Sequence, residues 1–233
     1  MAGWRPAAKI GMDRRLSFER NTETLQKSIE NSDARATPFR HWLVDRVFED
    51  DVIEALVALP FDAPRVEYSK GARAANNDTR SYFDPGRRDE FPVCQTVAEG
   101  FQNAETVKKI EAMCDIDLSG TYLRLEYAQD RDGFWLHPHK DISVKCLSML
   151  VYLSDAPEGE DWGTDIYSGP KEEDYFAPTP HQKNRALIFV PGSDTWHGFR
   201  CKPISGIRQT LIVNFVTDAW NSTHELAYPD QPV

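Results

Sequence analysis

A histidine and an aspartate two positions apart are the first candidate metal ligands. The chain has six histidines, and only His139 is followed two residues later by an acidic side chain, Asp141. In an extended segment, residues i and i+2 point to the same face, so this imidazole and this carboxylate can bind one ion. Because such a short pattern also arises by chance, it is weak evidence alone. The alternative is the polar edge of a surface strand.

A third candidate ligand follows a β-rich stretch of the chain. His197 lies in the segment Thr195-Trp-His-Gly198. Two histidines and one carboxylate on one side of an ion, with the other positions open, form the facial triad of non-heme Fe(II) sites. The open positions admit a bidentate co-substrate and dioxygen. Two alternatives stay open: His197 as an ordinary core histidine, and His137 as a rival ligand, although its position before Pro138 favours the rim of a pocket.

A charged residue inside an apolar strand marks a second candidate site. Arg208 begins the run Arg-Gln-Thr-Leu-Ile-Val-Asn-Phe215. Burying an unpaired charge is costly, so the guanidinium needs a partner. A carboxylate bound through two hydrogen bonds is suitable, and Thr210, on the same strand face, can donate one more. Alternatively, Arg208 pairs with an acidic residue of the protein, and Thr210 is explained by its β-propensity.

The elements that must position these residues differ along the chain. Residues 1–36 predict a polar N-terminal arm, residues 37–120 a strand with supporting helices, and residues 121–233 a run of short strands separated by turns. Such a run is typical of an antiparallel sandwich or barrel. The expected elements are a helix within 19–31, a strand at 39–44, a helix at 49–59, a loop over 62–88, one or two helices within 91–113, and strands at 122–127, 144–153, 164–167, 186–190 and 208–216. We predict a single, mainly β domain with flanking helices.

Composition and charge exclude several classes of protein. The 233 residues are 40% hydrophobic and 27% charged, which is ordinary for a globular domain. With 37 acidic and 27 basic residues, the net charge of −10 argues against binding to nucleic acid or to an anionic membrane. No apolar run approaches the length of a bilayer span, and the first residues lack the apolar core of a signal peptide. Four cysteines without paired metal spacing predict reduced thiols, and hence a cytoplasmic protein.

Six short motifs in the second half of the chain occur in an order typical of one enzyme superfamily. They are Leu123-Arg-Leu-Glu-Tyr127, Phe134-Trp-Leu-His-Pro-His139-Lys-Asp141, Leu150-Val-Tyr-Leu-Ser154, Asn184-Arg-Ala-Leu-Ile-Phe-Val-Pro191, Trp196-His-Gly198 and Gly206-Ile-Arg-Gln-Thr-Leu211. Together they resemble the 2-oxoglutarate/Fe(II)-dependent oxygenases, and more closely their prolyl-hydroxylase-like branch. The resemblance covers residues 121–216. It implies a double-stranded β-helix, or jelly-roll, core.

The resemblance also implies roles for six residues. It makes His139, Asp141 and His197 the Fe(II) ligands, Arg208 and Thr210 the residues that bind the distal carboxylate of 2-oxoglutarate, and Tyr127 a further co-substrate contact. The implied reaction uses O2 to hydroxylate an unactivated C–H bond of a small metabolite or a peptidyl side chain, and releases succinate and CO2. Ascorbate is a candidate reductant. Simple aromatic packing explains Tyr127 nearly as well.

Three positions qualify this resemblance. Val151 stands where some prolyl hydroxylases have a tyrosine against the distal carboxylate. Asn214 stands where the nucleic-acid demethylase branch has a second arginine, which agrees with the acidic net charge. Asp141 is present, whereas iron halogenases have a small residue there, so hydroxylation is the better interpretation.

Two rival functions and the choice of substrate stay open. The rivals are a cupin-like metalloenzyme that does not use 2-oxoglutarate and a non-catalytic jelly-roll binding module. The acidic stretch 155–174 is either a solvated loop or a lid that favours a cationic substrate. One arginine of a mixed-charge segment is a candidate anchor for a substrate carboxylate or phosphate. The arginines concerned are Arg73, Arg80, Arg87 and Arg88. The sequence does not indicate an oligomeric state.

Overall fold

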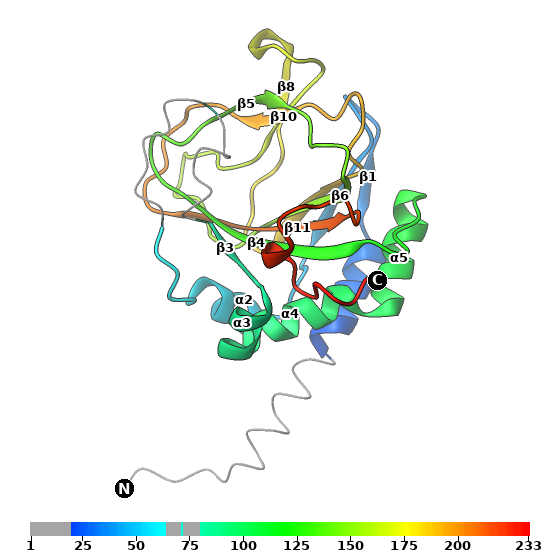
Figure 1. Ribbon diagram of the computed structural model, residues 1–233. Coiled ribbons are helices and arrows are strands. Elements are labelled where there is room, and N and C mark those ends of the chain that lie inside the picture. Colours follow the sequence, from blue (N-terminus) through cyan, green and yellow to red (C-terminus); the bar gives the residue numbers. More distant parts are fainter. Residues whose placement is uncertain (1–19, 64–70, 72–79) are drawn as a thin grey trace, which may run out of the picture.

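The computed structural model describes residues 20–63, residue 71 and residues 80–233. Two antiparallel sheets lie one above the other, and the helices pack against the outer face of the larger sheet (Figure 1). This arrangement is the mainly β, jelly-roll architecture with flanking helices that the sequence predicts. None of the helices in the described ranges is long and apolar enough to cross a membrane.

The strands and helices have the following bounds. The strands are β1 (Asp33–Arg35), β2 (His41–Asp45), β3 (Ser81–Tyr82), β4 (Tyr122–Asp130), β5 (Leu136–His139), β6 (Lys145–Tyr152), β7 (Asp165–Tyr167), β8 (Tyr175–Pro178), β9 (Arg185–Phe189), β10 (His197–Phe199) and β11 (Arg208–Val216). The helices are residues 20–30, α2 (Asp50–Val57), α3 (Pro85–Glu90), α4 (Pro92–Gln102) and α5 (Ala104–Cys114), with short 3-10 turns η2 (Glu172–Asp174) and η3 (Thr223–Glu225).

The strand order brings distant parts of the chain together. The larger sheet has the order β1-β2-β9-β6-β11-β4-β3, and the smaller sheet has the order β5-β10-β7-β8. The last long strand, β11, therefore lies between β4 and β6 and pairs with both along most of its length. Likewise β2, from the N-terminal part, pairs with β9. The N-terminal segment thus contributes a strand to the sheet as well as supporting helices.

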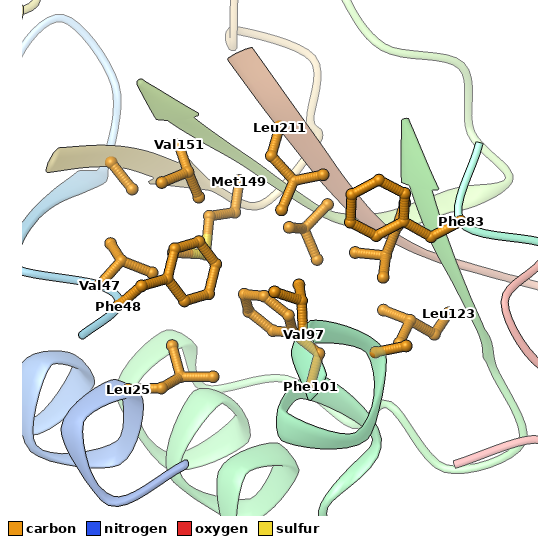
Figure 2. Packing of buried hydrophobic residues seen from close by; sticks show 14 of the residues in the cluster. Leu25, Val47, Phe48, Phe83, Val97, Phe101, Leu123, Met149, Val151 and Leu211 are labelled. Atoms are coloured by element: carbon orange, nitrogen blue, oxygen red, sulfur yellow. The ribbon is translucent and has the colours of Figure 1, made fainter. Parts of the chain in front are cut away.

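The two faces of the larger sheet differ because side chains alternate along each strand. The face toward the helices is apolar and belongs to one large core cluster. From β4, β6 and β11 it carries Leu123, Leu125, Leu147, Met149, Val151, Leu211, Val213 and Phe215. Figure 2 shows this packing, in which Val97 and Phe101 of α4 lie beneath the strands. The opposite face, toward the smaller sheet, carries polar side chains, and the candidate site lies there.

The description of residues 1–36 as a polar arm was wrong for the part that the structure describes. Residues 20–30 form a helix in which Leu25 and Ile29 are fully buried in the main core. These two residues are four positions apart, so they share one helix face. The other face is polar, which accounts for the polar composition. Residues 1–19 lie outside the described residues.

The predicted loop over residues 62–88 contains two elements. Strand β3 pairs with β4, and helix α3 begins at Pro85 after Asp84, whose side chain accepts a hydrogen bond from the Arg87 amide. Proline at the first helical position and an aspartate before it are ordinary helix-start signals. The segments 64–70 and 72–79, with Arg73, lie outside the described residues.

Candidate metal and co-substrate site

A cavity of about 610 Å³ lies between the two sheets. Its volume is in the range of pockets that hold small ligands. Five of the six predicted site residues line it: His139, Asp141, His197, Arg208 and Thr210. The sixth, Tyr127, does not. The larger sheet supplies the floor through its polar face, and β5 and β10 of the smaller sheet supply the opposite wall.

The two candidate histidine ligands face each other on neighbouring strands. His139 of β5 and His197 of β10 are paired in register, and their ring centroids are 4.4 Å apart. Each Nδ1 is hydrogen-bonded to a backbone carbonyl two residues earlier, of His137 at 2.8 Å and of Thr195 at 3.0 Å. An Nδ1–H that donates to a carbonyl leaves Nε2 as the unprotonated nitrogen, which is the metal-binding form.

Burial keeps both rings uncharged at neutral pH. Burial, followed by the neighbouring His197, lowers the pKa of His139 to about 4. Burial also lowers the pKa of His197. Neutral imidazoles are the ligands that a metal ion requires, because a protonated ring has no free lone pair.

Asp141 follows β5 and projects into the same cavity. Its Oδ1 accepts a hydrogen bond from Lys145 Nζ at 2.7 Å, and its Oδ2 accepts one from Ser148 Oγ at 2.5 Å. Burial alone raises the pKa of Asp141, but Lys145 and His197 and the two hydrogen bonds outweigh it, so this pKa lies below its ordinary value. The carboxylate is therefore ionised.

The three residues have the ligand types that bind Fe(II) in facial-triad sites. The two imidazoles also lie close enough together to share one ion. A carboxylate oxygen has two lone-pair directions, so each oxygen of Asp141 retains one beyond its present hydrogen bond. Nevertheless, no three His, Cys, Asp or Glu side chains in the described ranges already stand close enough together for a metal ion. Completing the set therefore requires a small change in the relative positions of these side chains.

A chain of buried hydrogen bonds connects Asp141 with the floor of the cavity. Asn214 Nδ2 donates to Ser148 Oγ at 2.9 Å, and Arg124 Nη1 donates to Asn214 Oδ1 at 3.1 Å. The three residues lie side by side on β6, β11 and β4. Sequence reasoning missed Arg124 and Ser148 as site residues. The alternation in Leu123-Arg-Leu-Glu126 held a usable signal, because it puts Arg124 on the face opposite the leucines.

Arg208 is buried at the start of β11 and already has a protein partner. Its Nη1 donates to Asp130 Oδ2 at 2.7 Å, and its Nε donates to the Trp162 carbonyl at 2.8 Å. The pairing with an acidic residue that the sequence left open as an alternative is therefore present, and the role of Arg208 as a 2-oxoglutarate contact stays a prediction. Its Nη2 donates no hydrogen bond to any described residue.

Thr210 is the clearest unsatisfied group in the predicted co-substrate region. The residue is 1% exposed, and its buried hydroxyl has no hydrogen-bond partner. Buried hydroxyls normally have a partner, so an unpartnered one on a cavity wall indicates a bound group. Tyr152, rather than Val151, lies on the same sheet face: its hydroxyl bonds to Thr164 and Thr179, and Val151 is in the helix-side core.

The prediction that Tyr127 contacts a co-substrate was wrong. Tyr127 alternates with Leu123 and Leu125, so its side chain points to the helix side of β4. Its hydroxyl donates to the Leu56 carbonyl at 2.9 Å and accepts a hydrogen bond from Gln209 at 3.0 Å. Tyr127 is a core residue that ties β4 to α2.

His137, the rival ligand candidate, lies at the rim of the cavity, and the buried Trp162 lies near Arg208. The His137 side chain is 58% exposed, and its Nδ1 is 3.6 Å from Glu172. Trp162 is buried in a small cluster with Phe134 and Phe199, and the Phe199 ring lies 4.6 Å from the Arg208 guanidinium. The sequence interpretation of His137 as a rim residue agrees with this position.

Comparison with solved structures identifies the fold. A prolyl 4-hydroxylase from Pseudomonas putida matches over 84% of this chain and 98% of its own, with 12% identity and a TM-score of 0.55. A prolyl hydroxylase from Trichoplax adhaerens, solved with a peptide of hypoxia inducible factor, matches over 92% and 94%, with 12% identity and a TM-score of 0.52. HygX from Streptomyces hygroscopicus, solved with nickel and 2-oxoglutarate, matches over 77% and 82%, with 14% identity and a TM-score of 0.51.

Comparisons of the sequence, in contrast to those of the fold, find no match. No family model matches it, and a comparison with curated proteins finds no relative. Fold similarity at this level of identity does not assign an activity. Together with the strand order and the paired histidines, it confirms the resemblance predicted from the motifs: the chain has the fold of the prolyl-hydroxylase-like 2-oxoglutarate/Fe(II) oxygenases.

Proposed function

We propose that this protein is an Fe(II)- and 2-oxoglutarate-dependent oxygenase that hydroxylates a small molecule or a peptide side chain. The observation that carries the proposal is the convergence of His139, His197 and Asp141 on one cavity between the sheets. His139 and Asp141 are neighbours in sequence, whereas His197 comes from a strand 56 positions beyond Asp141.

In the proposed centre, the protein holds the metal and excludes water. His139 and His197 bind through Nε2, with their rings oriented by the carbonyls of His137 and Thr195. Asp141 supplies the anionic ligand. When bound, iron and 2-oxoglutarate would activate O2, which supplies the oxidising power for attack on a C–H bond. The apolar residues around the cavity limit the access of solvent.

Thr210 and Arg208 are the proposed contacts for the distal carboxylate of 2-oxoglutarate. The Thr210 hydroxyl is buried and unpartnered, and the Arg208 Nη2 donates to no described residue. In this proposal Asp130 orients the guanidinium and keeps Nη2 directed at the co-substrate. A second candidate function is favoured by the same ion pair: because Asp130 neutralises Arg208, a cupin-like metalloenzyme without 2-oxoglutarate also fits this end of the cavity.

The test is the slow formation of succinate in the absence of substrate. Purified protein is incubated with Fe(II), ascorbate, O2 and 2-oxoglutarate, and succinate is measured. We expect the wild type to form succinate, and the variants His139→Ala, Asp141→Ala and Arg208→Met to form at least tenfold less. His137→Ala is the matched control, since this neighbouring histidine lies at the rim, and it retains the wild-type rate. The same background rate in all variants contradicts the proposal.

A further inference from the structure

A group of buried charges lines the cavity on the Asn214 side, away from the Arg208–Asp130 pair. We call it the Arg124 cluster, and its members are Arg80, Arg124, Glu126, Trp220 and Glu225. Arg124 Nε donates to Glu225 Oε2 at 2.6 Å, and Arg124 Nη2 donates to Glu126 Oε2 at 2.8 Å. Arg80 Nη1 donates to the same Glu126 carboxylate at 3.2 Å. All five residues line the cavity, but none of them is a candidate metal or 2-oxoglutarate ligand.

Burying four charges here is expensive and is not explained by the stability of the sheet. Arg124 and Glu126 are each 2% exposed. Replacing a buried ion pair by apolar side chains of similar volume is often neutral or stabilising. The corresponding positions on the other face of β4 are apolar, namely Leu123 and Leu125. Charges kept at this cost on a cavity wall indicate recognition of a ligand.

The cluster has hydrogen-bond donors without acceptors. Arg80 Nε is buried and has no partner, and Arg80 Nη2 donates to no described residue, since Glu126 takes only Nη1. The Nε–Nη2 edge of a guanidinium presents two parallel N–H groups, which match the two oxygens of a carboxylate. Trp220 Nε1 is also buried without a partner. The two buried, unpartnered N–H groups, Arg80 Nε and Trp220 Nε1, belong to residues that line one end of the cavity, and they call for an anionic or carbonyl acceptor.

One carboxylate oxygen of the cluster has no donor among the described residues. Glu225 uses Oε2 for Arg124, and its Oε1 accepts no hydrogen bond from any described residue. The Glu225 side chain is 10% exposed and faces the cavity. An ionised carboxylate oxygen in such a position is suited to an ammonium group. One end of the cavity therefore offers partners for both a carboxylate and an ammonium.

The free groups of the cluster point to a ligand that carries both charges. Within the cluster, Arg80 and Arg124 pair with Glu126, and Arg124 also pairs with Glu225. A zwitterion offers a carboxylate to the unpartnered N–H groups and an ammonium to the Glu225 carboxylate.

We propose that the Arg124 cluster binds the carboxylate and the ammonium of a zwitterionic α-amino acid, which is the substrate of this enzyme. Arg80 and Trp220 bind the carboxylate, Glu225 binds the ammonium, and Arg124 is a positioning residue that fixes Glu225 and Glu126. The hydrogen bonds from Arg124 through Asn214 and Ser148 to Asp141 join this subsite to the metal centre. This inference rests on the proposed function, whose cavity it shares.

The test is calorimetric binding of the twenty standard L-amino acids to the full chain, metal-free and again with Ni(II) and 2-oxoglutarate. The best binder is then compared with the carboxylic acid that lacks its amino group, with the amine that lacks its carboxylate, and with its N-acetyl amide. We expect each analogue to bind at least tenfold more weakly. Equal affinity for the analogues, or no binding by any of the twenty, overturns the proposal. Tighter binding of the N-acetyl amide than of the free amino acid also overturns the proposal, and indicates a peptide substrate.

Two variants assign the contacts to their groups. Arg80→Met is expected to lower the affinity for the amino acid and for the acid without the amino group at least tenfold. The affinity for the amine is expected to stay unchanged. Glu225→Gln keeps an acceptor for Arg124. It is expected to lower the affinity for the amino acid and for the amine and to leave the affinity for the acid unchanged. Arg88→Gln is the control, because Arg88 packs on Tyr228 outside the cavity. If a variant loses affinity for the acid and for the amine to the same extent, the assignment of its residue to one ligand group is contradicted.

Binding separates this inference from the proposed function. Succinate formation without selectivity for a zwitterion overturns the inference and leaves the oxygenase proposal intact. Selective binding of an amino acid with no succinate formation in any condition contradicts the oxygenase proposal and supports the subsite.

Discussion

Arg208 and Asp130 are partners in register on neighbouring strands, and their side chains form a buried ion pair at 2.7 Å from Nη1 to Oδ2. Both side chains are almost fully buried, at 3% and 1% exposure. Each charge therefore depends on the other for its stability in the folded protein. The pair also decides how the guanidinium can meet a ligand, because Nη1 and Nε are already engaged and only Nη2 is left.

Removal of Asp130 is expected to destabilise the fold strongly. Asp130→Ala leaves the Arg208 charge buried without its counter-ion, and such changes cost about 3–5 kcal/mol of unfolding free energy. Asp45→Ala is the matched control: Asp45 pairs with Arg185 at the surface, where a pair contributes about 1 kcal/mol or less. Urea unfolding measures both. Similar losses for the two variants contradict the structural role of Asp130.

Gly198 sets the spacing of the two histidine strands. A Cβ atom at Gly198 of β10 would lie 2.8 Å from the Leu136 carbonyl oxygen and 3.0 Å from that of His137, both on β5. Gly198→Ala is therefore expected to move His197 away from His139 and to weaken metal binding at least tenfold. In Gly100→Ala, the control in α4, the new Cβ meets nothing closer than 3.7 Å. Unchanged metal affinity in Gly198→Ala contradicts this account of the site.

Tyr127→Phe distinguishes a core tyrosine from a co-substrate contact. The variant loses the hydrogen bonds with Leu56 and Gln209 but keeps the ring packed against Phe61. We expect a loss of about 1 kcal/mol in unfolding free energy, with the affinity for 2-oxoglutarate unchanged. A clear loss of 2-oxoglutarate affinity in a stably folded variant shows that Tyr127 reaches the site.

His181 gives the stability of the protein a dependence on pH. Burial, followed by the nearby charge of Arg208, lowers the pKa of His181 to about 4, with Lys202 adding to this effect and Asp161 opposing it. The unfolded chain takes up a proton near pH 6.5, whereas the folded protein takes it up only near pH 4. Stability from this residue is thus complete above pH 6.5 and falls as the pH drops toward 4, by about 3 kcal/mol at most.

The measurement for His181 is unfolding free energy against pH. We expect the wild type to lose more stability between pH 6.5 and 4 than His181→Gln, which cannot titrate. Parallel curves for the wild type and His181→Gln refute the assignment.

Much of the fold follows from local pattern, whereas its short strands do not. The helices α2, α4 and α5 and the long strands β4, β6 and β11 lie where apolar periodicity predicts them. The strands β5, β8 and β10 have only three or four residues, and pairing with distant segments defines them. The alternation of apolar and polar residues is too short in these three strands to predict them. The two histidines were nevertheless found, because the family motifs mark them.

The partners of the site residues were harder to predict than the residues themselves. Asp130 is 78 positions from Arg208, and nothing local connects them. The error on Tyr127 had a different cause, since its parity with Leu123 and Leu125 was visible in the sequence and indicates the core face. The same parity puts Arg124 and Glu126 in the cavity, so reading both faces of β4 together recovers part of the site.

Anaerobic titration with ferrous iron and 2-oxoglutarate examines the proposed centre most directly. The account predicts one ferrous ion per chain and, on addition of 2-oxoglutarate, a visible metal-to-ligand charge-transfer band that is absent from His197→Ala and Asp141→Ala. No band in the wild type, or a band of equal strength in these variants, contradicts the central claim.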